Sequence, residues 1–343
     1  MALLLACTPV KRDADPSSAD GFLAPGGGSG SAQPCLAEQY PIVFTSTRGD
    51  SINGLELYVM SFDGAVKQIG FRPRFIAPRW SPDGRAVAFR HQVAEVLGAT
   101  IASEVQLIAP DGNERVSLTA PEIMPVNDHS VLPIDAPSWS PDGTTLAYAK
   151  TDGANASVWL VPREGGEPRR LLPELEAAHH SPSWSDGASI ALVVERSGVE
   201  DIWRVDADAP AWPGIALTAG QVQMPRSLRW SPDGRRIAFS ALDPSPGTGG
   251  DFEIFLLDVA TGTLTQLTHD DATDLHPVWS PDGNELLITR GASLADAGAL
   301  PLDTQRLELW RLPLSDPESA EPITFDGWMN CAADWFAGGC GPP

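Results

Sequence analysis

Hydrophobic residues along this chain fall into short runs of three or four, and turn-forming residues separate the runs. Short apolar or alternating runs of this kind predict half-buried β-strands. One set lies at 86–89, 146–148, 190–193, 237–239 and 286–288. A second set lies at 105–108, 158–160, 202–205, 254–257 and 307–310. The pattern therefore predicts an all-β protein built from many short strands.

A recurring motif, Trp-Ser-Pro-Asp-Gly, precedes the first set of runs and divides the chain into units. Complete copies begin at Trp80, Trp139, Trp230 and Trp279, a copy without Pro begins at Trp184, and a degenerate copy surrounds Trp335. Successive tryptophans lie 59, 45, 46, 49 and 56 residues apart, close to the ~40–45 residues of a four-stranded propeller blade. Ser-Pro-Asp-Gly is itself a turn sequence. We therefore expect blades of four antiparallel strands.

The unit that begins at Trp335 is too short to complete a blade. Three unassigned strands near the N-terminus supply what is missing, at 42–44, 56–59 and 66–69. We predict that these strands pair with the C-terminal strand at 332–335 and close the ring. The expected fold is an all-β, six-bladed β-propeller that occupies residues 35–343.

The first 34 residues have a different character. Leu4-Leu5-Ala6-Cys7 resembles the bacterial lipobox, in which the cysteine is acylated, so residues 1–7 are interpreted as a signal remnant with Cys7 as the lipidation site. A chance match is the alternative, because a basic n-region and a long apolar h-region are not visible. Residues 8–34 are rich in Gly, Ser and Pro. Such a segment buries too little surface to order itself, so we expect a flexible linker.

The other three cysteines flank the two ends of the expected propeller, at Cys35, Cys331 and Cys340. This distribution favours a disulfide that joins the chain ends in an oxidising compartment. Three unpaired thiols are the alternative, and the sequence does not determine the pairing. No histidine accompanies these cysteines at ligand spacing, so a structural zinc site is not expected.

The chain is strongly acidic, with 45 Asp and Glu against 23 Lys and Arg and a net charge of −22. Binding to a phosphate backbone or to an anionic membrane surface requires clustered basic residues. We therefore expect no nucleic-acid partner, and membrane contact only through the lipid anchor. The acidity is interpreted as a contribution to solubility, and we expect a monomer.

Taken together, the Trp-Ser-Pro-Asp-Gly units, the Ile-Ala-Phe run at 237–239, the Ile-Trp pair at 202–203 and the Leu-Thr pair at 217–218 resemble the propeller of the TolB family. The resemblance covers residues 41–336. TolB is the periplasmic component of the Tol-Pal cell-envelope system. The resemblance implies a periplasmic or outer-membrane-anchored lipoprotein that binds a protein or peptide partner, without catalysis and without a cofactor.

Two enzyme families also carry similar propellers. The repeat is similar to that of prolyl oligopeptidases and dipeptidyl peptidases, whose separate hydrolase domain contains a Gly-x-Ser-x-Gly motif that this sequence lacks. It is more distantly similar to oligogalacturonate lyases, propellers that use histidine ligands for a metal. A metal-dependent enzyme acting in the central channel is therefore the alternative function.

The two faces of the expected propeller differ in their loops. With the tryptophan strand innermost, the Ser-Pro-Asp-Gly turns lie on what we call the first face. The loops between second and third strands and the connections between blades lie on the second face. Long insertions gather on the second face, at 91–103, 120–134, 242–250 and 291–306, whereas 206–214 lengthens the first. Functional residues concentrate in loops on a rigid scaffold, so we expect the second face to bind the partner.

Polar residues just before each tryptophan enter the central channel from the second face. The candidate binding residues at the channel mouth are Arg74, Asp135, His180, Arg226, Asp274, His276 and Asn330. Histidine and carboxylate side chains suit divalent cations, and Asp128, His129 and His179 lie nearby. His179 and His180 are adjacent on a strand, so at most one of them faces the channel. We interpret the set as solvated channel lining, and predict neither a metal site nor catalytic residues.

The tryptophans separate into two groups. The six that begin the repeats recur once per blade, which indicates packing between blades. Trp212 and Trp328 fall outside this pattern, and they are the candidates for exposed aromatic contacts.

Overall fold

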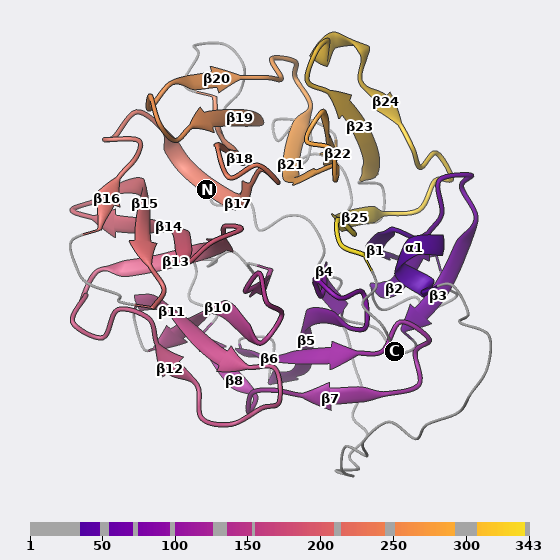
Figure 1. Ribbon diagram of the computed structural model, residues 1–343, viewed down its shortest axis with the longest axis horizontal. Helices are drawn as coiled ribbons and strands as arrows, with labels where there is room; N and C mark the ends of the chain where they lie inside the picture. The colour runs from indigo at the N-terminus through magenta and orange to yellow at the C-terminus, as the bar shows by residue number, and fades with distance from the viewer. Residues whose placement is uncertain are drawn as a thin grey trace.

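The computed structural model describes residues 35–48, 55–70, 75–96, 100–125, 136–152, 155–208, 214–243, 251–291 and 307–339. Six sheets surround a central axis, each with a path of four antiparallel strands (Figure 1). The predicted all-β six-bladed propeller is therefore confirmed. The expected lipobox and linker lie outside the described residues. Within the described part of the chain, no helix combines the length and the apolar character needed to cross a membrane.

The blades follow one another along the chain, and in each the strand that carries the motif tryptophan is innermost, with the other three following outward. Blade 1 contains β25 (Asn330–Trp335), β1 (Ile42–Ser46), β2 (Glu56–Met60) and β3 (Val66–Gly70). Blade 2 contains β4 (Phe75–Trp80), β5 (Val87–Val96), β6 (Thr100–Ile108) and β7 (Arg115–Ser117). Blade 3 contains β9 (Ser138–Trp139), β10 (Thr145–Asp152), β11 (Asn155–Pro162) and β12 (Arg169–Arg170).

The remaining blades repeat this order. Blade 4 contains β13 (Ala178–Trp184), β14 (Ser189–Arg196), β15 (Val199–Asp206) and β16 (Ile215–Ala216). Blade 5 contains β17 (Gln223–Trp230), β18 (Arg236–Leu242), β19 (Phe252–Asp258) and β20 (Leu264–Gln266). Blade 6 contains β21 (Thr273–Trp279), β22 (Glu285–Gly291), β23 (Glu308–Pro313) and β24 (Glu321–Pro322). Two short helices, α1 (Leu36–Gln39) and a 3₁₀ turn at Pro317–Ser319, accompany the strands.

The ring closes as predicted, because strand β1 pairs antiparallel with β25 in blade 1. Ile42 lies opposite Trp335, and Ser46 lies opposite Asn330. The Thr45 hydroxyl donates to the Cys331 carbonyl at 2.9 Å, which ties positions far apart in the sequence. Closure leaves no blade without neighbours, and a closed ring has no long free sheet edge between blades.

The Ser-Pro-Asp-Gly turn is held by its own side chains. In blade 2 the Ser81 hydroxyl donates to the Asp83 carboxylate at 2.5 Å and accepts the Ala86 backbone N–H at 2.9 Å. Gly84 has a φ of 65°, which explains why the motif ends in glycine. The same serine–aspartate bond recurs in blades 3, 5 and 6, at 2.6, 2.6 and 2.7 Å.

The motif tryptophans join neighbouring blades, in agreement with their interpretation as packing residues. The Trp230 indole N–H donates to the Ser183 carbonyl of blade 4 at 3.1 Å, and the Trp279 indole donates to the Arg229 carbonyl of blade 5 at 3.0 Å. Hydrophobic clusters fill the same junctions. Between blades 3 and 4, for example, Leu160 packs in one buried cluster with Leu192.

The Leu-Thr pairs that end several blades also have a structural role. The Thr268 hydroxyl accepts the Ile254 backbone N–H at 2.9 Å and donates to Glu253 at 2.5 Å. In blade 6 the Thr324 hydroxyl likewise accepts the backbone N–H of Leu309. Each threonine therefore fixes the fourth segment of its blade against the third strand, near the second face.

One insertion differs from its expectation. The sequence predicts a loop on the second face at residues 91–103, but most of these residues extend strands β5 and β6. An additional strand, β8 (Glu122–Pro125), pairs with β6. Residues 94–96 pair with 100–102 beyond a register shift at 92–94, so the insertion lengthens the hairpin of blade 2 through a β-bulge instead of forming an irregular loop.

The cysteines of the described chain are not free thiols. Cys35 and Cys331 are both disulfide-bonded. Cys35 precedes α1 and lies near the Ser-Pro-Asp-Gly turn of blade 2, whereas Cys331 is buried in β25. Cys7 and Cys340 lie outside the described residues.

The closure of blade 1 can be tested by truncation. Removal of residues 328–343 deletes β25 and exposes β1 as a free edge, and such edges promote aggregation. We expect the truncated protein to aggregate or to lose cooperative melting, as measured by size-exclusion chromatography and calorimetry. A peptide of residues 328–343 added during refolding should restore part of the soluble fraction. A soluble truncated protein with the wild-type melting temperature would contradict this closure.

Candidate functional site

The innermost strands place polar residues around the channel in three layers. The mouth layer contains the residues four or five positions before each tryptophan, the middle layer those three before, and the base layer those one before. Among the predicted site residues, His180, Arg226, Asp274 and Asn330 lie in the mouth layer, and His276 lies in the middle layer. Arg74 and Asp135 lie outside the described residues.

His180 and Arg226 come from adjacent blades and share one carboxylate. Arg226 donates to both oxygens of Glu200, at 2.7 and 3.0 Å, and His180 Nε2 lies 3.4 Å from the same carboxylate. Burial alone would raise the pKa of Glu200, but hydrogen bonds from His180 and Arg226 and the Arg226 charge lower that pKa to about 2. Glu200 of blade 4 and Arg226 of blade 5 therefore form an ion pair at pH 7 that links the two blades at the channel mouth.

The adjacent His179 is directed elsewhere. It is fully buried, and its Nδ1 lies 2.9 Å from the Ala177 carbonyl. Burial lowers the pKa of His179 to about 4, so the imidazole is neutral at pH 7. Of these two histidines, His180 contacts the Glu200 carboxylate and His179 does not, because adjacent residues of a strand point to opposite sides.

Asp274 is paired within its own blade. Arg290 donates to both of its carboxylate oxygens, at 2.7 and 2.6 Å, and also lies 3.0 Å from Asp270. Glu253 lies beside this group and is fully buried. Burial raises the pKa of Glu253 to about 8, assisted by the charges of Asp274 and Asp270 and opposed by the Thr268 hydroxyl. Glu253 is therefore mainly protonated at pH 7.

Asn330 organises the connection between blades 6 and 1. Its amide nitrogen donates to Asp326 at 3.0 Å and to Glu308 at 3.1 Å, and its amide oxygen accepts the Ser46 hydroxyl at 2.8 Å. Asn330 is completely buried. Its side chain is therefore a structural tie and not a group presented to a ligand.

The middle layer contains strained backbone. Five of its residues, none of them glycine, have φ between 49° and 54°: Ala77, Ser181, Ser227, His276 and Ala332. The pairing registers shift at this point in the innermost strands of blades 1, 2, 4, 5 and 6, as expected for β-bulges. Left-handed non-glycine residues are strained and persist where the surrounding structure fixes them. The repeated bulge therefore directs the channel lining in each of these blades.

His180 and His276 lie in different layers of the channel. His180 belongs to the mouth layer of blade 4, whereas His276 belongs to the middle layer of blade 6. Within the described ranges, no group of three or more His, Cys, Asp or Glu side chains is placed to hold a metal ion. His129 and Asp128 lie outside those ranges.

Below the mouth, the described residues leave an axial cavity of only about 10 Å³. It is lined by Ala77, Arg79, Ala136, Ser181, Pro182, Ser227, Leu228, Arg229 and His276. That volume is about the space of one water molecule. This cavity therefore has no room for an oligosaccharide or peptide.

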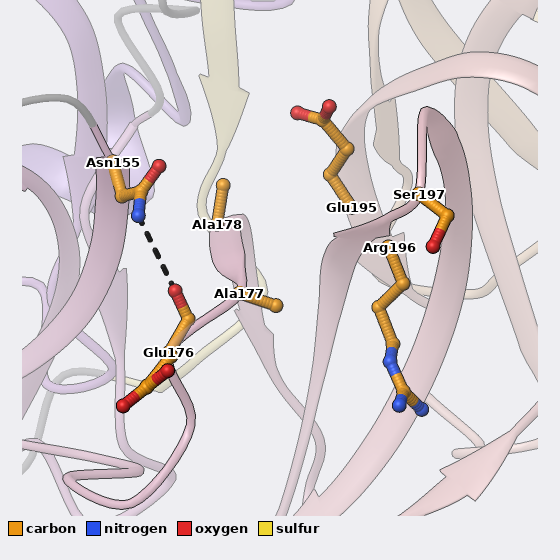
Figure 2. A pocket seen from close by; sticks show the side chains of 7 residues that line it. All are labelled: Asn155, Glu176, Ala177, Ala178, Glu195, Arg196 and Ser197. Atoms are coloured by element: carbon orange, nitrogen blue, oxygen red, sulfur yellow. Dashed lines mark hydrogen bonds between the residues drawn. The ribbon is translucent and has the colours of Figure 1, made fainter.

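A larger hollow lies on the second face, between blades 3 and 4, and sequence analysis did not identify it. This interblade groove has a volume of about 380 Å³ and is lined by Asn155, Glu176, Ala177, Ala178, Glu195, Arg196 and Ser197 (Figure 2). Asn155 donates to the Glu176 carbonyl at 3.3 Å along one wall. Glu195, Arg196 and Ser197 form the opposite wall (Figure 2). These residues belong to no repeated motif, so no sequence signal marked them.

Exposed apolar side chains accompany the groove on the second face. Val199 is 48% exposed and Met224 39% exposed, and both lie near the junction of blades 4 and 5. Phe325 is 88% exposed and Trp328 42% exposed, in the connection from β24 to β25. The expectation for Trp328 agrees with this exposure, whereas Trp212 lies outside the described residues. The first face also carries an exposed aromatic residue, Phe62, at 74%.

The shared carboxylate at the mouth can be tested by an isosteric change. Glu200→Gln removes the charge that pairs with Arg226 and should lower the free energy of unfolding at pH 7 by about 1–3 kcal/mol. A lowered pKa stabilises the fold above the ordinary value of 4.5. This contribution is lost as pH falls from about 4.5 toward 2, so the difference from wild type should shrink over that range in urea titrations.

The matched control for this experiment is Glu195→Gln, one strand away on the groove wall. Glu195 is exposed, so its replacement should leave stability within about 0.5 kcal/mol of wild type. An equal effect of the two substitutions, or a Glu200→Gln effect independent of pH, would show that the mouth-layer pairing is wrong.

Comparisons with known proteins support a common fold but no single function. No protein-family model matches the chain. The uncharacterized protein Atu1656 of Agrobacterium fabrum is 27% identical over 216 residues, which cover 62% of this chain and 65% of that protein. The uncharacterized peptidase YuxL of Bacillus subtilis is 25% identical over 231 residues, 66% of this chain and 31% of the peptidase. The Tol-Pal system protein TolB of Francisella tularensis is 23% identical over 257 residues, 72% of this chain and 54% of TolB.

Solved structures agree with the architecture. TolB from Acinetobacter baumannii has a TM-score of 0.63 at 18% identity, and the match covers 87% of this chain and 67% of that one. A putative TolB from Agrobacterium tumefaciens has a TM-score of 0.54 at 22% identity, over 82% and 87% of the two chains. A puromycin-hydrolyzing peptidase of Mycobacterium tuberculosis matches with a TM-score of 0.51 at 15% identity, over 82% of this chain and 44% of that one. Likeness at these identities is a likeness of fold. The chain is a six-bladed β-propeller, and its fold is similar to that of TolB.

Proposed function

We propose that this chain is a non-enzymatic binding propeller of the cell envelope, which engages a protein or peptide partner through its second face. The observation that carries the proposal is the interblade groove itself, together with the exposed Val199 and Met224 at the next junction of the same face. Phe325 and Trp328 are exposed on that face as well, in the connection from β24 to β25 on the opposite side of the ring (Figure 1). Groups of exposed apolar residues with polar surroundings are typical of interaction surfaces.

The walls of the groove give it a stable shape. Asn155 begins β11, and Glu195 and Arg196 end β14, so both walls are the ends of regular strands. Ala177 and Ala178 form the floor, where small side chains leave room for a bound segment. Pre-formed clefts on rigid scaffolds are favoured binding sites.

The chemistry of the groove favours a polar, extended segment. Glu176 and Glu195 present carboxylates, Arg196 presents a guanidinium, and Asn155 presents an amide. The protein has a net charge of −22, which favours association with partners that carry basic side chains. We propose a partner segment with Lys or Arg beside Glu176 and Glu195, flanked by apolar residues that contact the neighbouring exposed side chains.

The pairing of the mouth residues supports binding over catalysis. Arg226, Asp274 and Asn330 each make hydrogen bonds to groups of the same chain. These bonds engage the three side chains in joining neighbouring elements of the ring. The proposed role therefore uses the mouth layer as a rigid support for the second face, and involves neither turnover nor a cofactor.

The location in the cell envelope rests on two kinds of support. The disulfide-bonded states of Cys35 and Cys331 suit an oxidising compartment, and the lipobox-like segment around Cys7 suits a lipid anchor. The TolB relatives have the same type of propeller. We propose that the protein is a monomer, periplasmic or anchored to the outer membrane through Cys7.

Site-specific crosslinking in the native host tests this proposal. A photoreactive residue at Glu195 or Trp328, both on the second face, should give a discrete crosslinked adduct with one protein. The matched control places the same residue at Phe62, which is more exposed than Trp328 but lies on the first face. We expect at least a roughly tenfold lower adduct yield from the Phe62 position, because that face would turn away from the partner.

Two outcomes of this experiment would contradict the proposal. Equal adduct yields from both faces would show that contact is unspecific, and the assignment of the second face would be wrong. Identification of the crosslinked partner by mass spectrometry, followed by loss of the adduct in Glu176→Lys and Glu195→Lys variants, would support the proposed charge complementarity. Persistence of the adduct in those variants would overturn it.

A further inference from the structure

Three charged residues meet at the axis of the propeller in the base layer. Arg79, Arg229 and Asp334 each stand one position before a motif tryptophan, in blades 2, 5 and 1. Arg79 Nε lies 3.9 Å from Asp334 Oδ1, and the second carboxylate oxygen accepts the Trp80 backbone N–H at 2.8 Å. The base layer therefore brings two guanidinium groups and one carboxylate together inside the channel.

The Arg229 guanidinium lacks hydrogen-bond partners for some of its N–H groups. Its Nε and Nη2 atoms are buried and have no hydrogen-bond partner within the described part of the chain. Arg79 is better placed, because it donates to the carbonyls of Pro78 and Ala333 at 2.6 and 3.2 Å. A buried cation without a partner is costly, so Arg229 requires an additional group.

The charges at the axis do not balance. Burial lowers the pKa of Arg229 to about 10, so the guanidinium still carries its proton at pH 7. Burial raises the pKa of Asp334 to about 6, and the charge of Arg229 opposes that rise, so the carboxylate is mainly ionised at pH 7. Arg79 and Arg229 contribute two positive charges and Asp334 contributes one negative charge, which leaves one positive charge uncompensated among these three residues.

The axial cavity lies beside this uncompensated charge. Arg79 and Arg229 both line it, and the hydroxyl-bearing residues Ser181 and Ser227 belong to its wall. Most of the remaining wall is apolar, from alanine, proline and leucine side chains. Such surroundings strengthen the attraction between a guanidinium and a negative ion, because little water competes. The volume of about 10 Å³ admits one particle of about the size of a water molecule.

We propose that the axial cavity is a binding site for a single monatomic anion of the halide class, held by Arg229 and Arg79. The ion accepts hydrogen bonds from the Arg229 guanidinium and balances the charge of the base layer. Chloride is the natural occupant because it is the most abundant monatomic anion, and polyatomic anions are larger still. The site couples blades 2 and 5, which lie across the ring from one another, through one central ion.

Thermal unfolding of the full chain tests the site with chloride itself as the probe. At equal ionic strength, replacing gluconate by chloride should raise the melting temperature by roughly 2–4 °C, because an ion that binds the folded state stabilises it. Arg229→Met removes the guanidinium and keeps an apolar side chain of similar length, so the chloride-dependent increment should disappear. Arg235→Met, a substitution of an exposed arginine on the first face, should retain the full increment.

A second measurement covers the case in which Arg229→Met does not fold. Wild-type crystals soaked in bromide should show an anomalous scattering peak in the axial cavity beside the Arg229 guanidinium. A melting temperature that is the same in chloride and gluconate, or a bromide-soaked cavity that contains only water, would overturn the proposal. So would a chloride increment that survives in Arg229→Met.

Discussion

The contact between the tryptophan of one blade and the residue before the tryptophan of the preceding blade determines the rest of this structure. It takes two forms. The indole N–H donates to a backbone carbonyl for Trp139, Trp230 and Trp279. The backbone N–H donates to a side-chain oxygen for Trp80, Trp184 and Trp230. Each hydrogen bond contributes about 1 kcal/mol on its own. The contact recurs at five of the six junctions in the described part of the chain and sets the angle and spacing of those blades. At the sixth, the Trp335 indole N–H has no hydrogen-bond partner within the described residues, and Trp335 packs in a hydrophobic cluster with Val278 instead.

This contact also explains the contents of the channel. The residue before each tryptophan lies at the junction with the next blade, and two of these residues, Arg79 and Arg229, also line the axial cavity. Serine occupies this position at Ser138 and Ser183, where the hydroxyl accepts the next tryptophan's backbone N–H. Arg79 and Arg229 occupy the same place with a charge, and a charge held there must be compensated. The second face is left to loops and strand ends, where the groove forms.

The sequence predicted what depends on repetition and missed what depends on contacts between unlike residues. The spacing of the motif tryptophans was sufficient for six blades, and the incomplete unit at Trp335 was sufficient for closure with 42–44. The left-handed bulge at Ser181, Ser227 and His276 had no signal, because tertiary packing and not glycine holds it there. Glu200 was missed for a similar reason, since its importance comes from Arg226 of another blade. The groove has no motif, because the irregular connection of blade 3 forms its floor.

Blade 1, built from both ends of the chain, should be as firmly part of the ring as the continuous blades. Native-state hydrogen exchange measures this directly, by comparing β1 and β25 with the central strand β14 of blade 4. If the ring unfolds as one unit, amides in all three strands should exchange with the same free energy of opening, equal to that of global unfolding. Exchange of β1 and β25 through a separate opening of clearly lower free energy would contradict the account.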